Sequence, residues 1–199
     1  MRYTASSFDA MYQQNDDPWG FKSRWYEARK RALTLACLPT RRYASGYEPG
    51  CANGELSAAL APRCDRLLVT DGSRKAVDLA TTRLADLRQV EVRQAWIPEQ
   101  WPIRIFDLIV LSEFGFYMDG PQLDAVVDAA LASLGPDGKV LACHWRRPVE
   151  DCRLDGDQVH RRLSEGLALP VLCQLVEPDL RIDVWCRDPR SVAQREGFV

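Results

Sequence analysis

The chain has 199 residues, 46% of them hydrophobic and 27% charged, which is typical of one soluble globular domain spanning residues 1–199. Its formal net charge of −2 gives no electrostatic reason to bind nucleic acid or an anionic membrane. No apolar run is long enough to span a bilayer, and residues 1–7 lack the apolar core of a secretory signal.

The first 38 residues are predicted to be helical. Asp16-Asp17-Pro18 offers capping residues and a proline for a helix start, and Pro39 ends the segment. Between residues 22 and 38, apolar side chains recur at helical spacing. They predict the stripe by which a helix packs on a neighbouring layer, and they are Trp25, Ala28, Ala32, Leu35 and Ala36.

Strands and helices alternate in the core that follows, residues 39–188. The patterns predict strands over 43–47, 66–70, 90–95, 106–112 and 139–145, and helices over 55–60, 73–87, 122–134 and 157–167. Gly135-Pro136-Asp137-Gly138 predicts a turn before the fifth strand. His160 falls within the last of these helices and is expected at the surface.

Two further strands close the core, over 171–176 and 180–185. Three residues separate them, which is too few for a parallel crossover, so they must pair antiparallel. The second strand alternates apolar and polar residues, which favours a place nearer the sheet edge. Residues 189–199 are expected to form a tail.

A glycine-containing turn, Glu48-Pro49-Gly50-Cys51-Ala52-Asn53-Gly54, joins the first strand to the first helix. Glycines let a ligand approach where a Cβ would collide. The second strand ends on Asp71, and an acid at that strand tip can accept hydrogen bonds from both ribose hydroxyls. The combination predicts a site for a nucleoside cofactor.

The spacing of this turn departs from the Gly-x-Gly-x-x-Gly pattern of dinucleotide sites. A pyrophosphate needs free N–H groups at a helix N-terminus, and Glu48 would repel it. Glu48 instead favours a cationic ligand, and the sulfonium and amino groups of S-adenosylmethionine are cationic. The structural alternative is that Glu48 caps a loop while Gly50 and Gly54 serve a tight turn.

These residues resemble those of class I S-adenosylmethionine-dependent methyltransferases, and in particular the nodulation protein S (NodS) type of small-molecule N-methyltransferase. The resemblance covers about residues 16–188. Its motifs are 16–19, the turn 48–54, Phe106-Asp107-Leu108-Ile109-Val110-Leu111-Ser112-Glu113, Phe116-Tyr117 and 134–138.

The resemblance implies a Rossmann-like, seven-stranded α/β sheet of order 3-2-1-4-5-7-6, with the last-numbered strand antiparallel, and an N-terminal helical lid over residues 1–38. It implies S-adenosylmethionine as cofactor and S-adenosylhomocysteine as product. The implied cofactor contacts are Glu48, Gly50, Cys51, Gly54, Asp71 and Glu113. Trp96 stands where the family commonly has an acid, so it either covers the adenine face or packs a loop.

An acceptor site is expected beyond the carboxyl ends of the strands. His144 is a candidate proton acceptor, or otherwise a histidine that supports a loop. Glu113 is the second catalytic candidate, with a structural contact to the N-terminal segment as its alternative. Aromatic and basic residues near these ends form the candidate acceptor platform, or ordinary packing: Trp19, Phe116, Tyr117, Trp145 and Arg146.

The seven cysteines are irregularly spaced without a Cys-x-x-Cys, and there are only two histidines. We therefore expect no metal site and reduced thiols, as in a cytoplasmic protein.

The expected function is methyl transfer to a small molecule, with an amine or amino-sugar-like acceptor favoured and with neither nucleic acid nor membrane as partner. A module of the same fold that binds cofactor or a partner without catalysis is the alternative. A nicotinamide reductase fits less well, because the glycine spacing and a substrate domain are both missing.

Overall fold

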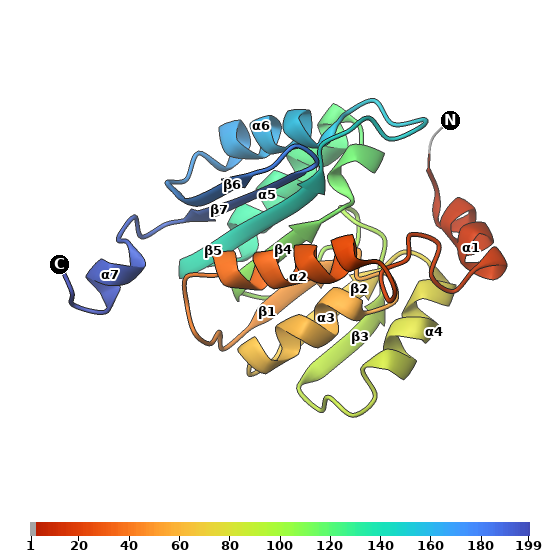
Figure 1. Ribbon diagram of the computed structural model, residues 1–199, viewed down its shortest axis with the longest axis horizontal. Coiled ribbons are helices and arrows are strands. Elements are labelled where there is room, and N and C mark those ends of the chain that lie inside the picture. Colours follow the sequence, from red (N-terminus) through yellow and green to blue (C-terminus); the bar gives the residue numbers. More distant parts are fainter. Residues whose placement is uncertain (1–2) are drawn as a thin grey trace.

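A seven-stranded sheet forms the centre of the protein, as the computed structural model shows for residues 3–199 (Figure 1). The strand order is β3-β2-β1-β4-β5-β7-β6. Strand β7 runs antiparallel to both of its neighbours, and the other pairs are parallel. The order and the antiparallel strand are confirmed. The strands are β1 Gly46–Pro49, β2 Leu67–Asp71, β3 Val90–Gln94, β4 Phe106–Ser112, β5 Leu134–Trp145, β6 Val171–Val176 and β7 Leu180–Cys186.

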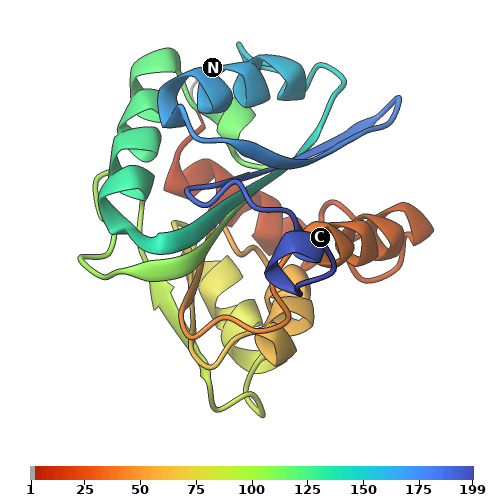
Figure 2. The ribbon, with the colours of Figure 1, turned by 90° about the vertical axis from the view of Figure 1, so that its left-hand side faces the viewer.

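Helices cover both faces of the twisted sheet (Figure 2). One face carries α2, α3 and α4, and the other carries α5 and α6. Helix α1 lies against α4, and α7 stands at the C-terminal end (Figure 1). The helices are α1 Ala5–Gln14, α2 Trp25–Cys37, α3 Glu55–Leu60, α4 Arg74–Arg83, α5 Gly120–Ser133, α6 Gly156–Leu167 and α7 Val192–Arg195, with short 3-10 turns η1 Ala61–Arg63 and η2 Gly115–Tyr117.

The core consists of two apolar layers, one on each face of the sheet. Because strand side chains alternate between faces, Leu108 and Val110 of β4 join the layer under α2, α3 and α4. Ile109 and Leu111 join the layer under α5 and α6. All four are essentially inaccessible to solvent. No helix within residues 3–199 is long and apolar enough to cross a membrane. The first two residues of the predicted lid lie outside the described residues.

Two predictions for the N-terminal segment are wrong. No helix starts at Pro18: residues 16–24 form turns, because the Asp17 carboxylate accepts the backbone N–H groups of Phe21 and Lys22. The apolar stripe of α2 does not face the sheet. Trp25 is 77% exposed, and Ala32 and Ala36 are also exposed. The buried face is polar and consists of Glu27, Lys30 and Thr34.

Three predictions for the C-terminal half are also wrong. Gly135–Gly138 does not form a separate turn, since β5 begins at Leu134 and takes these residues in as an irregularity of its pairing with β4. The alternating strand, β7, is internal, and β6 is the edge. The polar residue Asp183 of β7 is accommodated because it pairs with His160, which is fully buried rather than at the surface.

Candidate functional site

A cavity of about 580 Å³ opens beyond the carboxyl ends of β1, β2, β4 and β5. Its place is the switch point of the sheet, where the chain order changes direction between β1 and β4, and this is where open α/β sheets bind ligands. The volume is in the range of small-molecule sites. The lining comes from the strand ends and from the segment 3–34, so residues far apart in the sequence share one cavity.

The turn after β1 forms one wall. Gly50 and Gly54 have φ values of +71° and +81°, a left-handed backbone that side chains with a Cβ adopt at a cost. Gly54 also starts α3, and a Cβ there would lie 3.2 Å from Cα of Ala80. The turn is held to β2 by the Cys51 N–H, which donates to the carbonyl of Thr70 at 2.9 Å. Gly54 thus serves a tight turn, which was the alternative to a ligand contact. Gly50 and Cys51 line the cavity.

Glu48 lies at the base of the cavity with 2% of its surface exposed. Within residues 3–199, its Oε2 has no hydrogen-bond partner. Burial raises the pKa of this carboxyl to about 8. An unpartnered buried acceptor is costly, and a positively charged donor from a ligand would satisfy it. A buried carboxyl at this position therefore fits a cationic group of a cofactor.

Asp71 ends β2 beside the same turn. Its Oδ2 accepts the Ala52 N–H at 3.0 Å, and its Oδ1 accepts the Ser73 N–H at 2.9 Å. Burial raises the pKa of Asp71 to about 6, although these hydrogen bonds oppose the shift. A carboxylate has about four lone-pair positions, so these backbone hydrogen bonds do not use all of its capacity to accept from a ribose hydroxyl. The predicted role in holding a ribose is compatible with this geometry.

Trp96 follows β3 and closes the cavity beside Asp71. Its ring lies directly on Gly72, where a Cβ would come within 2.1 Å of the ring carbon Cε3. The indole therefore forms a flat wall next to the predicted ribose position. It packs a loop, as one alternative for Trp96 has it, and it also lines the cavity, while its contact with an adenine stays a prediction.

Helix α2 contributes a buried ion cluster to the cavity. Lys30 Nζ lies 2.6 Å from Glu113 Oε1 and 2.8 Å from Glu27 Oε2. Burial opposes the charge on Lys30, but the two carboxylates more than offset this and raise its pKa. Glu113 has a left-handed φ of +58° and also accepts the Trp145 N–H at 2.9 Å. Glu113 thus makes a structural contact to the N-terminal segment, which was the alternative to a catalytic role.

Helix α1 and the turn after it lie over the cavity and are tied to the strand ends. Asp9 accepts a hydrogen bond from the Ser73 hydroxyl at 2.5 Å, and Asp17 accepts one from the Asn53 amide at 3.0 Å. Tyr12 is 2% exposed and lines the cavity. Helix α1 and the turn after it, which we call the cover, therefore enclose the cavity together with the sheet.

Four of the predicted acceptor residues share this cavity: Trp19, Phe116, Tyr117 and Trp145. Their rings pack on other aromatic rings, with centroids 5.6 Å apart for Tyr12 and Trp19 and 4.8 Å apart for Phe116 and Tyr117. The arrangement is both ordinary packing and a set of flat apolar walls.

Besides Gly54, two predicted residues lie outside the cavity lining. Arg146 donates to both carboxylate oxygens of Asp157 and to the carbonyl of Glu177. His144 is fully buried, and both of its ring nitrogens are within hydrogen-bond distance of protein groups. Burial, then His160 and Lys30, hold the pKa of His144 well below its usual range. The geometry thus supports the alternative for His144, a histidine that supports a loop.

Sequence reasoning missed several lining residues. Glu27 and Lys30 were hidden because apolar spacing was expected to mark the buried face of α2. Their polar spacing, with Thr34 one turn further, was the signal that could have revealed a second, polar face. Gly72 carried no signal of its own, since its place depends on its contact with Trp96.

Comparison with known proteins agrees with this geometry. The model of the family Nodulation protein S (NodS) matches residues 10–159. Nodulation protein S of Rhizobium tropici is 30% identical over 128 residues, which are 63% of this chain and 54% of that protein. The homologue from Bradyrhizobium diazoefficiens is 31% identical over 126 residues, 61% of this chain and 59% of that protein. The chain thus spans little more than half of the length of these curated relatives.

Solved structures share the fold. A candidate methyltransferase from Pseudomonas syringae is 52% identical with a TM-score of 0.75, covering 82% of this chain and all of that one. The N-methyltransferase NodS of Bradyrhizobium japonicum, in complex with S-adenosyl-L-homocysteine, has a TM-score of 0.84 at 24% identity, covering 94% of this chain and all of that one. Both have the strand and helix arrangement described above. By the extent of the family match, this chain belongs to the NodS family.

Proposed function

We propose that this protein is an S-adenosylmethionine-dependent methyltransferase that acts on a small-molecule acceptor, namely an amine or amino-sugar-like compound. The observation that carries the proposal is that two buried carboxyls, Glu48 and Asp71, line one cavity at the switch point of the sheet, and that Oε2 of Glu48 has no hydrogen-bond partner within residues 3–199. Family membership supports the same assignment.

The residues present suit each part of the cofactor. Glu48 would accept a hydrogen bond from its cationic portion, and Asp71 would accept from the ribose hydroxyls. Gly50 and Cys51 leave room for it along the turn, and Trp96 would lie against the adenine. When bound, this cofactor supplies a methyl carbon that a sulfonium has already activated, so the protein contributes mainly orientation, which can supply several kcal/mol.

The charged side chains at the acceptor end of the cavity would favour a positively charged acceptor. Lys30 carries one positive charge between the two carboxylates Glu27 and Glu113, so the cluster has a net charge of about −1. A negative cluster in a partly closed, low-dielectric site attracts an ammonium group and repels carboxylate or phosphate. The aromatic walls beside it, including Tyr117 and Trp145, suit a ring or apolar body.

An amine must present its lone pair before it can accept a methyl group. Each oxygen of Glu113 accepts one hydrogen bond, from Lys30 or from the Trp145 N–H, and keeps a second lone pair for the acceptor. We propose that Glu113 orients the acceptor nitrogen and receives its proton directly or through water. His144 has no place in this step, because it lies behind the lining.

Calorimetric titration with S-adenosylhomocysteine tests the cofactor site. We expect micromolar binding by the wild-type protein. Asp71→Ala removes the acceptors for the diol, and Gly50→Val places a branched side chain at a left-handed φ, so each should weaken binding by about tenfold or more. The exposed Asp86→Asn is the matched control and should bind normally.

Incubation of cell extract with the protein and deuterated-methyl S-adenosylmethionine then tests transfer. A mass shift in a small amine would support the whole proposal. Cofactor binding without any labelled product would favour the non-catalytic module instead. Binding that is unchanged in both variants would show that the cofactor lies elsewhere.

A further inference from the structure

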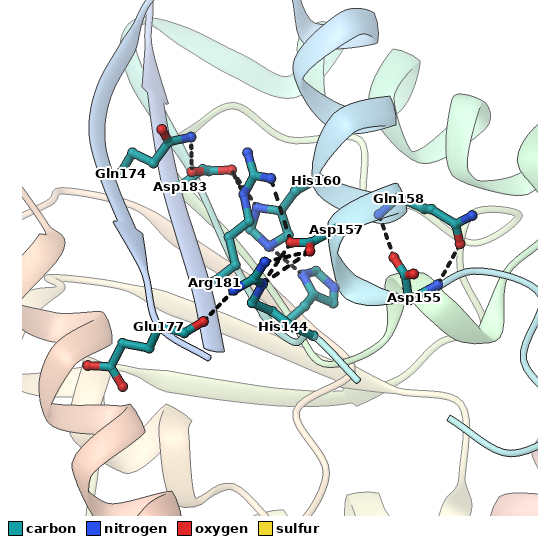
Figure 3. A network of polar contacts seen from close by, with 10 residues as sticks. His144, Asp155, Asp157, Gln158, His160, Gln174, Glu177, Arg181 and Asp183 are labelled. Atoms are coloured by element: carbon teal, nitrogen blue, oxygen red, sulfur yellow. Dashed lines mark hydrogen bonds and ion pairs between the residues drawn. The ribbon is translucent and has the colours of Figure 1, made fainter. Parts of the chain in front are cut away.

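Two buried histidines form a continuous chain of hydrogen bonds behind the cavity (Figure 3). His144 Nδ1 lies 3.1 Å from His160 Nε2, and His160 Nδ1 lies 2.6 Å from Asp183 Oδ2. At the other end, His144 Nε2 accepts the backbone N–H of Gly115 at 3.2 Å. The two imidazoles and the Asp183 side chain have at most 1% of their surface exposed. The chain thus crosses from β7 through α6 and the end of β5 to η2.

The protonation of both rings follows from the donor at one end. The Gly115 amide can only donate, so His144 Nε2 has no proton. In its neutral form, His144 then carries its proton on Nδ1 and donates to His160 Nε2. His160 in turn carries its proton on Nδ1 and donates to Asp183. A charged His160 would present a second proton to His144 and force a proton onto the nitrogen that the Gly115 amide already occupies.

The Asp183 end of the chain is fixed by further donors. Its Oδ1 accepts from Gln174 Nε2 at 2.9 Å, and its Oδ2 accepts from Arg181 Nε at 2.8 Å (Figure 3). Burial disfavours the charge on Asp183, but His160, Gln174 and Arg181 more than offset this and lower its pKa. Burial lowers the pKa of His160, which Asp183 partly opposes. An ionised acceptor therefore meets two neutral rings.

The Gly115 end meets the cavity. Phe114, Phe116 and Tyr117 all line it, while Gly115 itself is turned to the core. A Cβ on Gly115 would come within 2.5 Å of Val159 Cγ1 and 3.1 Å of His144 Nε2. Phe114 in turn lies against Gly50 of the cofactor turn, where a Cβ would be 3.4 Å from its ring. A small displacement at Gly115 would therefore move lining side chains on both sides.

We propose that the chain from Asp183 through His160 and His144 to the Gly115 amide positions the cavity segment Phe114–Tyr117, and that both histidines carry their proton on Nδ1. His144, His160 and Asp183 are positioning residues for the acceptor. The inference that this segment contacts the methyl acceptor rests on the proposed methyltransferase function. The tautomers and the hold on Gly115 rest on geometry alone.

Nitrogen-15 NMR of labelled wild-type protein tests the tautomers directly. Each imidazole should show a protonated Nδ1 and an unprotonated Nε2 at neutral pH. A proton on Nε2 of either ring would overturn the proposal, and this measurement needs no variant to fold.

Two substitutions of His144 then separate positioning from mere support of the fold. His144→Gln can place an amide oxygen near the former Nε2 and keep an acceptor for Gly115, whereas His144→Leu cannot. We expect amide exchange at Gly115 to rise about tenfold or more in the leucine variant, with recovery of most of this protection in the glutamine variant. Exchange at Ile109 in the sheet centre should be unchanged in both.

Two measurements test the effect on function, namely methyl labelling of cell extract and binding of S-adenosylhomocysteine. In His144→Leu, methyl labelling of cell extract should fall about tenfold or more, while the Kd for S-adenosylhomocysteine should change less than threefold. The glutamine variant should recover most labelling. Equal losses in both variants, or unchanged exchange at Gly115, would contradict the proposal. If wild-type protein binds no S-adenosylhomocysteine, the proposed function fails, yet the tautomers and the Gly115 exchange still decide this inference.

Discussion

At the residue scale, Glu48 is a buried carboxyl that is suited to a cationic ligand. Its carboxyl is buried without a partner for Oε2 in the described part of the chain, and it therefore holds its proton to about pH 8. A cationic ligand would restore the charge and supply the missing donor. Binding should then release a proton near neutral pH.

Glu48→Gln should stabilise the empty protein at high pH and weaken ligand binding. The folded pKa of about 8 lies above the ordinary value of 4.5. The folded state therefore holds its proton more tightly than the unfolded state. The resulting stability is complete below about pH 4.5 and is lost as pH rises through about 8. In the variant, urea unfolding should depend less on pH across this window.

The same variant should bind S-adenosylhomocysteine about tenfold or more weakly at pH 8, since a charged acceptor is lost. Exposed Glu165→Gln is the control and should change neither quantity. An unaltered pH profile in Glu48→Gln would mean that Glu48 is already ionised in the empty protein.

At the scale of elements, helix α2 turns a polar face to the sheet and an apolar residue to solvent. Thr34 donates its hydroxyl to the Lys30 carbonyl and lies 3.5 Å from Cys143 Sγ. The face is tolerated because Lys30 neutralises part of the charge of Glu27 and Glu113. Ion pairs of this kind contribute little net stability, but removal of one partner leaves buried charge behind.

Lys30→Met should accordingly destabilise the protein by about 3 kcal/mol in urea unfolding at pH 7, because it leaves the buried Glu27 and the partly buried Glu113 without their cation. Lys30→Met combined with Glu27→Gln should recover part of the loss, since one of those charges is removed as well. The exposed Lys22→Met serves as control. A loss below 0.5 kcal/mol in Lys30→Met would show that the cluster is hydrated.

At the scale of the whole molecule, the segment before β1 and the strand ends form one enclosure. Asp9 and Asp17 tie the cover to Ser73 and Asn53, and Tyr12 and Lys30 line the cavity from above. A ligand in this cavity would contact both the cover and the sheet. Ligand binding should therefore order parts of the chain that are distant in sequence.

Hydrogen exchange followed by mass spectrometry checks this expectation. Saturating S-adenosylhomocysteine should slow exchange in Ala5–Gln14 as well as in the turn 50–54, because local opening of the cover would have to expose the ligand. The C-terminal helix Val192–Arg195 lies apart and should be unaffected (Figure 1). Protection confined to the strand ends would show that residues 3–38 do not act as a lid.

The sequence by itself determined the alternation of strands and helices and the glycine turn with Asp71. Strand β4 and helix α3 have the predicted bounds. These features are set by periodicity and by turn residues, which act over a few positions of the chain. The sheet order came from the resemblance, since pairing between distant strands leaves no local pattern.

The tertiary structure alone decided which polar groups are buried. Lys30 contacts Glu113, which is 83 positions away in the sequence, and His160 contacts Asp183, which is 23 positions away. A polar side chain can be buried only where such a partner satisfies it, and the partner is fixed by the packing of the sheet. For this reason the sequence places His160 at the surface, leaves both a catalytic and a loop-supporting role open for His144, and does not predict the polar face of α2.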